Sequence, residues 1–205
     1  SQGRIHIMAG AGSNNTKEAI SLTQEAQQLG ANSVLSIVPY YNKPSQEGMF
    51  AHFKAIAQSS DIPIILYNVP GRTVVDLNND TVLRLAELKN IVGLKDATGH
   101  IARACDLLKR VPKDFALYSG DDPSSLAFML CGGHGVVSVC ANIFPQLFAK
   151  MCQAALNKDV QKARELNKQL QVVYPILFYE PSPAVTKWIL YKMKKCGLQT
   201  RLPVS

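Results

Sequence analysis

Short apolar runs rich in β-branched residues alternate with longer segments of helical periodicity along most of this chain. This alternation constrains the fold more than any other feature, because strands that are separated by helices lie parallel in one sheet. The sequence therefore predicts an α/β protein made of repeated βα units. The six expected strands cover residues 5–10, 33–41, 62–70, 91–96, 115–122 and 135–142.

Helical periodicity fills the segments between these strands, and typical start and stop residues mark several helices. Thr16 precedes an acidic residue and an apolar periodic run that ends at Gly30, and Ser45 and Asn78 stand at two further starts. From Pro145 onward the chain is helical by period, with one break at residues 180–183. We expect two parts: a partial barrel over residues 1–144, and a helical segment over residues 145–205 that packs on or beside it.

Repeated βα units form either a doubly wound sheet or a TIM (β/α)8 barrel, and two features favour the barrel. The segment AGAGSNN after the first strand lacks the GxGxxG spacing of a dinucleotide-binding turn. Polar residues also recur at the carboxyl ends of the strands, where barrel enzymes place their sites. These residues are Asn14, Tyr40, Tyr41, Tyr67, Lys95, Asp121 and Asp122. Six strands are two fewer than a full barrel has, so we expect six of its eight βα units.

Composition and charge exclude several classes of protein. No apolar run approaches the roughly 18–20 residues that span a bilayer, and no signal peptide is visible. The net charge is +7, but the basic residues are scattered, which argues against a nucleic-acid partner. Five cysteines without CxxC spacing argue against a disulfide framework and a zinc site. We therefore expect a cytoplasmic protein without a metal, whose thiols are reduced and mostly buried.

The run IVGLKD raises a chemical question, because it ends an apolar strand on the ammonium group of Lys95. Residues two apart share a strand face, so Lys95 lies on the face of Gly93, which we expect to leave room beside the lysine stem. Desolvation lowers the pKa of a lysine, and a neutral amine can attack a ketone to form a Schiff base. Taken alone, the residue could instead be a strand-end lysine that reaches solvent.

Three neighbouring features admit a chemical and a structural interpretation. Tyr67, at the end of the preceding strand, could exchange protons with an imine or be a rim tyrosine with a satisfied hydroxyl. Arg72 could bind a carboxylate through two hydrogen bonds or be a solvated loop arginine. The aromatic pair Tyr40 and Tyr41 lies on a loop, where packing or an interface is the alternative.

Five stretches occur in order at the spacing of βα units: VPYYNKPSQEG, YNVPGRT, GLKDATG, SGDD and GGHGVVSVCAN. Together they closely resemble the dihydrodipicolinate synthase / N-acetylneuraminate lyase family of class I aldolases, over nearly all 205 residues. The resemblance implies a lyase that condenses pyruvate with L-aspartate 4-semialdehyde to give 4-hydroxy-tetrahydrodipicolinate, in the diaminopimelate route to lysine. It implies no cofactor other than the covalent imine, and a homotetramer that is a dimer of dimers.

The same resemblance implies a role for each matching position. Lys95 corresponds to the lysine that captures pyruvate, and Tyr67 to the tyrosine that donates and accepts protons. Tyr41 corresponds to the relay tyrosine that is lent across the tight-dimer interface. Val137 corresponds to the residue whose backbone helps to hold pyruvate, and Arg72 to the arginine that binds the carboxylate of aspartate semialdehyde.

A regulatory site is implied as well, since Asn14, Glu18 and Tyr40 correspond to positions of a feedback site for L-lysine at the same interface. One departure is Asp96, where many relatives have Glu. We expect little effect on the site, because Asp96 lies on the strand face opposite Lys95.

The family's early Gly-Thr-Thr-Gly-Glu motif does not occur in this chain. It supplies a threonine of the proton relay, so we expect a fragment that lacks the first two βα units and the C-terminal end, and that is inactive alone. Two alternatives to the synthase remain open. One is a pyruvate-dependent sugar-acid lyase of the same family, against which Arg72 argues, and the other is a piece that only assembles or binds lysine.

Overall fold

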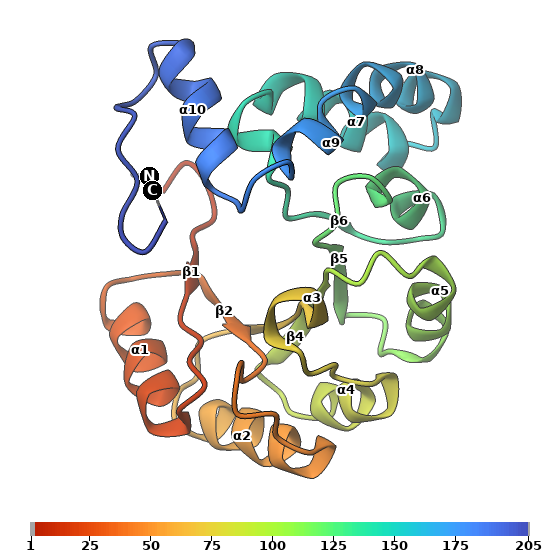
Figure 1. The fold of residues 1–205 in the computed structure, drawn as a ribbon. Coiled ribbons are helices and arrows are strands. Elements are labelled where there is room, and N and C mark those ends of the chain that lie inside the picture. The colour runs from red at the N-terminus through yellow and green to blue at the C-terminus, as the bar shows by residue number, and fades with distance from the viewer. Residues whose placement is uncertain (1–2, 205) are drawn as a thin grey trace. The chain divides into compact units, whose positions relative to one another are not determined.

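The computed structural model describes residues 3–204 and divides the chain into two units, the first ending at Gly120 and the second beginning at Asp121. The first unit contains five strands that alternate with helices (Figure 1). Ser1, Gln2 and Ser205, at the outer ends of the two expected parts, lie outside the described residues. The division expected at residues 144/145 follows the change from strands to helices and stays a prediction.

The strands of the first unit form a parallel sheet in chain order. They are β1 (Met8–Gly10), β2 (Ser33–Ile37), β3 (Ile64–Asn68), β4 (Ile91–Asp96) and β5 (Ala116–Ser119). The register pairs Tyr67 of β3 with Lys95 of β4, and Asn68 with Asp96. Because side chains alternate across a strand, Tyr67 and Lys95 share one face of the sheet, and Asn68 and Asp96 share the other.

Helices connect these strands and bury their apolar stripes against the sheet. They are α1 (Thr16–Gln28), α2 (Gln46–Gln58), the short α3 (Pro70–Thr73), α4 (Asn79–Ala86) and α5 (Ile101–Arg110). Side-chain oxygens cap several of their first turns, as Asn15 does for α1, Ser45 for α2 and Asn78 for α4. In α2 the buried stripe includes Met49, Phe53 and Ile56, as the spacing of the apolar residues predicts.

The second unit is mainly helical. It comprises α6 (Ser125–Leu130), the two-residue strand β6 (Gly135–Val136), the 3₁₀ turn η1 (Cys140–Asn142), α7 (Pro145–Leu156), α8 (Val160–Gln171), α9 (Tyr174–Leu177) and α10 (Ala184–Lys192). The expected break at residues 180–183 separates α9 from α10. Phe148 and Met151 of α7 and Leu170 of α8 belong to its core.

The predicted α/β architecture of alternating parallel strands and helices is confirmed, but among the described residues only β4 has its expected length, and the other five strands are shorter than their apolar runs. β1 begins only at Met8, because the Asn32 side chain accepts the Ile7 N–H at 2.8 Å in place of a neighbouring strand. The last strand ends at Val136. Downstream, the Asp122 carboxylate accepts the N–H groups of Val139 (3.1 Å) and Cys140 (2.9 Å), which turns the chain into η1.

The five cysteines are free thiols, as expected, but they are not mostly buried. Only Cys140 is fully buried, while Cys105, Cys131 and Cys196 are exposed. Burial raises the pKa of Cys140 to about 11, and the charge of Asp122 adds to the effect, so this thiol is unreactive. Within residues 3–204, no helix combines the length and the apolar character that crossing a bilayer requires.

Candidate active site

Lys95 and Tyr67 meet at the carboxyl ends of two adjacent strands. Each is the second-to-last strand residue, and the parallel register sets them side by side. The Lys95 Nζ lies over the Tyr67 ring, 4.1 Å from its centroid, and both side chains are partly buried. An aromatic face attracts an ammonium group, so the ring fixes where the amine points and brings a phenol beside it.

Tyr67 is suited to donate a proton at neutral pH. Burial raises the pKa of its phenol above the usual value of 10, and the positive charge of Arg72 partly offsets this rise. The phenol therefore stays protonated until a base removes its proton, and the cation of Arg72 stabilises the phenolate when that happens.

Arg72 owes its place to α3, a single helical turn that the periodicity of the sequence did not predict. Pro70 opens this turn, where the missing N–H of proline is tolerated, and the N–H of Arg72 donates to Val69 O at 2.9 Å. The turn ends at Val74, whose φ of 68° is in the left-handed region. Arg72 is exposed and sits in the last helical position but one, next to the strand end that carries Tyr67.

The space beside Lys95 comes from Gly120, and the expectation that Gly93 provides it was wrong. A Cβ on Gly93 would lie 2.6 Å from Ala116 O, so this glycine permits the close approach of β5. A Cβ on Gly120 would lie 2.7 Å from Lys95 Cε and 2.8 Å from Ala97 Cβ. The lysine stem thus runs across the bare backbone of Gly120, which belongs to the next strand end.

Tyr40 and Tyr41 lie on the loop after β2. The Asn42 N–H donates to Tyr40 O at 2.9 Å, which closes a γ-turn centred on Tyr41, and Tyr41 has a φ of 71°. A left-handed backbone is uncommon for a bulky residue, and such strain gathers at functional sites. Tyr41 is 87% exposed, so the strained turn presents an aromatic residue to the outside of this chain.

Two of the three residues of the expected lysine site, Asn14 and Tyr40, lie on loops that are joined by hydrogen bonds, and the third, Glu18, lies in α1. Asn14 Nδ2 donates to Tyr40 O at 3.1 Å, and the Asn42 amide donates to Asn14 O at 2.9 Å. The Glu18 carboxylate, in the first turn of α1, accepts the Ser13 hydroxyl at 2.6 Å. Asn14, Glu18 and Tyr40 therefore belong to one connected region of the first unit.

Val137 is the one predicted site residue in the second unit. It directly follows β6 and is half-buried. Its contact with pyruvate stays a prediction. Among residues 3–204, no group of three or more His, Cys, Asp or Glu side chains is arranged to hold a metal ion.

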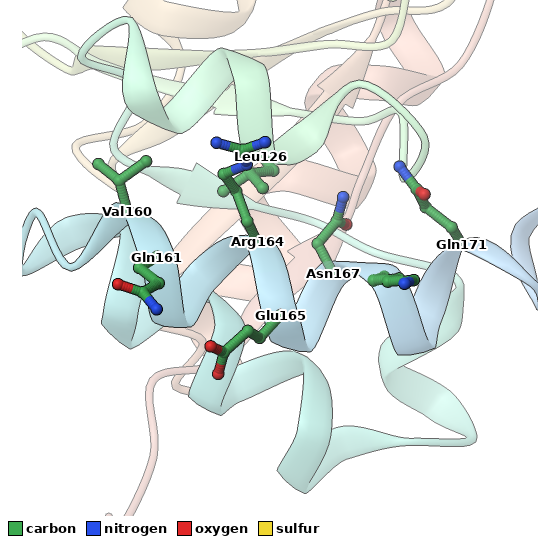
Figure 2. A pocket seen from close by; sticks show the side chains of 8 residues that line it. Leu126, Val160, Gln161, Arg164, Glu165, Asn167 and Gln171 are labelled. Carbon is green, nitrogen blue, oxygen red and sulfur yellow. The ribbon is translucent and has the colours of Figure 1, made fainter.

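A separate pocket of about 940 Å³ lies in the second unit between α6 and α8 (Figure 2). Leu126 contributes from α6, and all other lining residues come from α8: Val160, Gln161, Arg164, Glu165, Asn167, Lys168 and Gln171. Its only lysine, Lys168, is exposed on the helix surface. Lys95, by contrast, is partly buried against the Tyr67 ring, so this pocket lacks the feature that marks the Lys95 site.

Two polar residues lie on the sheet face opposite the site: Asn68, which the sequence did not single out, and Asp96, for which little effect was expected. Asn68 is completely buried, and its amide donates to Asp96 at 3.2 Å on the sheet face opposite Tyr67 and Lys95. A signal was available: in YNVP and LKDA a polar residue directly follows each catalytic candidate, and buried polar groups need hydrogen-bond partners.

Comparison with known proteins agrees with this geometry. The 4-hydroxy-tetrahydrodipicolinate synthase of Laribacter hongkongensis is 61% identical over 203 residues, 99% of this chain and 70% of that protein. The crystal structure of the chloride-inhibited dihydrodipicolinate synthase of Acinetobacter baumannii complexed with pyruvate has a TM-score of 0.98 at 48% identity. It covers all of this chain, which spans 70% of that one.

A third relative is the dihydrodipicolinate synthase of Cyanidioschyzon merolae, whose structure was determined with lysine bound. It has a TM-score of 0.93 at 38% identity, over 98% of this chain and 68% of that one. The sequence model of the dihydrodipicolinate synthetase family matches residues 1–205. The match to the family over the whole sequence, the high identity to named relatives and the similarity to solved structures all point to one family. The chain belongs to the dihydrodipicolinate synthetase family.

Proposed function

We propose that Lys95 captures pyruvate as a Schiff base and that Tyr67 moves the protons of this step. The function is that of a 4-hydroxy-tetrahydrodipicolinate synthase, a lyase that condenses pyruvate with L-aspartate 4-semialdehyde on the way to lysine. The observation that carries the proposal is the Lys95 Nζ over the Tyr67 ring, 4.1 Å from its centroid, at neighbouring strand ends.

The first chemical step needs Lys95 as a neutral amine, since only the lone pair attacks the keto carbon of pyruvate. A carbinolamine forms, and a proton donated to its hydroxyl lets water leave and the imine form. The Tyr67 phenol is a suitable donor, because burial keeps it protonated. Removal of a methyl proton then gives an enamine, the carbon nucleophile that attacks the aldehyde.

Arg72 selects the second substrate in this proposal. Its guanidinium is exposed on α3 beside the Tyr67 strand end, and two parallel N–H groups match a carboxylate such as that of aspartate semialdehyde. A pyruvate-dependent sugar-acid lyase is the alternative within the family. Assays with both aldehydes distinguish the two, and we expect turnover only with aspartate semialdehyde.

Tyr41 and Val137 have further proposed roles. The 87% exposure of Tyr41 on a strained turn supports a ring that serves a second subunit, as expected for a relay tyrosine lent across a dimer interface. The Val137 backbone would help to hold pyruvate. We further propose assembly as a dimer of dimers, and L-lysine binding at Asn14, Glu18 and Tyr40. The hydrogen bonds between the two loops, and a relative whose structure has lysine bound, support the lysine site.

The six strands of this chain would correspond to strands three to eight of an eight-stranded barrel. Their parallel βα order, and the 68–70% of the length of the three relatives that the chain spans, support this assignment.

Reduction of the enzyme with borohydride in the presence of pyruvate tests the Schiff base. The imine is converted to a stable secondary amine, so peptide mass spectrometry should find pyruvate on the peptide that carries Lys95. The Lys95→Arg variant is the control, and it should take up no pyruvate. An adduct on any other lysine would contradict the assignment.

A further inference from the structure

We infer that a hydrogen-bond network behind the active site has two branches, one that positions the strand end carrying Lys95 and one that positions the loop carrying Arg72. The network consists of Asn68, Asp76, Asp96, Thr98 and Arg103, all in the first unit. It starts one residue after each catalytic candidate, because Asn68 follows Tyr67 and Asp96 follows Lys95. These side chains lie on the opposite face of the sheet, so they are positioning residues that act through the backbone. The inference rests on the proposed function.

The strand branch joins the ends of β3 and β4. Asn68 Nδ2 donates to Asp96 Oδ1 at 3.2 Å, and the Thr98 hydroxyl donates to Asp96 Oδ2 at 2.7 Å. Asn68 is fully buried and Asp96 is 6% exposed. The Ala97 N–H also donates to Asn68 O at 2.9 Å, so the two strands stay bound beyond the Tyr67–Lys95 pair. Bonds to a buried carboxylate are strong, and losing them leaves buried donors unsatisfied.

The loop branch holds the segment that brings Arg72 to the site. Asn68 Nδ2 donates to Asp76 Oδ1 at 2.7 Å, and Asn68 Oδ1 accepts the Leu77 N–H at 3.0 Å. From α5, Arg103 Nη1 contacts both Asp76 oxygens, at 2.8 and 2.7 Å, while its Nη2 donates to Leu77 O. The Arg103 side chain is only 15% exposed. The loop that begins with α3 is therefore fixed at its far end.

Asn68 is the shared member, and the two branches diverge from its amide. The strand branch holds the backbone that carries Lys95, and the loop branch holds the residues that follow Arg72. Asp96, for which the sequence suggested little influence, thereby becomes a positioning residue for the lysine. Because displacing a reacting group by about 1 Å can lower a rate roughly 100-fold, the branches should affect different steps.

The experiment compares Asp96→Ala and Arg103→Ala in the purified enzyme. Two quantities are measured: the rate at which borohydride traps pyruvate on Lys95, and the KM for aspartate semialdehyde. We expect Asp96→Ala to slow trapping roughly tenfold or more. We expect Arg103→Ala to raise the KM roughly tenfold, because the Arg72 contact is misplaced, with trapping within about twofold of wild type.

Matched variants separate positioning from general loss of stability. Arg84→Ala also removes an arginine that forms a two-point ion pair, with Glu47, and it should change neither quantity. Asp96→Asn keeps an acceptor for Asn68 and can donate to Thr98, so it should restore most of the trapping rate. If Asp96→Ala fails to fold, the isosteric Thr98→Val removes one bond of the strand branch and should slow trapping with an unchanged KM.

Hydrogen exchange provides a readout that does not depend on catalysis. Arg103→Ala should speed exchange of the amides of residues 72–77, and Asp96→Ala that of residues 95–98. Equal effects of both variants on both quantities, or no effect of either, would overturn the network. A wild-type enzyme that traps no pyruvate on Lys95 would overturn the proposed function instead, and the exchange pattern would still decide whether the two branches act separately.

Discussion

Substitution of Gly120 by Ala should disable the Schiff-base lysine while leaving the fold intact. The new Cβ would lie 2.7 Å from Lys95 Cε, 3.2 Å from Lys95 Cγ and 2.8 Å from Ala97 Cβ. Carbon atoms normally approach to about 3.5 Å, so the overlaps are about 0.8, 0.3 and 0.7 Å. Something in the site must therefore move.

Of the groups in contact, the long Lys95 stem has the most rotatable bonds, so we expect it to take up most of the displacement. The Gly120 N–H donates to Asp96 O at 2.8 Å and the Ala97 N–H donates to Asn68 O at 2.9 Å, so both backbones are anchored. The amine should shift by about 1 Å, which lowers the rate of imine formation by roughly 100-fold. The free energy of unfolding should fall by only about 1–3 kcal/mol, the usual cost of overpacking.

The rate of imine formation is measured by adding borohydride at set times after pyruvate and detecting the adduct by intact-protein mass spectrometry. Urea unfolding measures the free energy of unfolding. Gly48→Ala is the matched control, because its new Cβ would be 3.4 Å from Pro44 Cβ and 3.5 Å from Ser45 Oγ, which are ordinary contacts. Trapping at the wild-type rate in Gly120→Ala would refute the idea that this glycine makes room for the lysine.

Three further changes test other parts of the molecule. Arg72→Ala should reduce kcat/KM for aspartate semialdehyde roughly ten- to thousand-fold and leave pyruvate trapping intact. Steady-state kinetics that show normal use of both substrates would contradict the role of Arg72. Glu18→Ala should weaken inhibition by L-lysine roughly tenfold, whereas Glu25→Ala on the same helix should not, and unchanged inhibition removes Glu18 from the site. Burial lowers the pKa of His52 to about 4, so the folded state binds fewer protons than the unfolded state between pH 6.5 and 4. Stability should therefore fall by roughly 3 kcal/mol as the pH drops through this range, and His52→Gln should remove that part of the pH dependence in urea unfolding.

Features of this protein that depend on residues adjacent in the sequence could be predicted from the sequence. The apolar run 91–96 coincides with β4, and Ser45 and Asn78 cap the helices where the pattern placed them. Periodicity, caps and strand faces are properties of a few consecutive residues, so a single chain displays them directly. The pairing of Lys95 with Tyr67 was also within reach, because adjacent parallel strands align the residues near their carboxyl ends.

Tertiary structure decided everything that depends on how one strand end meets the next. The sequence does not distinguish the roles of Gly93 and Gly120. In the folded sheet Gly93 lies against the backbone of Ala116, whereas Gly120 lies against the side chain of Lys95. Likewise, Asp96 points away from the site, as alternation requires, and only the fold shows that Asn68 and Thr98 meet it there. Such contacts join residues up to 28 positions apart. Their geometry depends on sheet register and loop closure, which no local pattern of residues specifies.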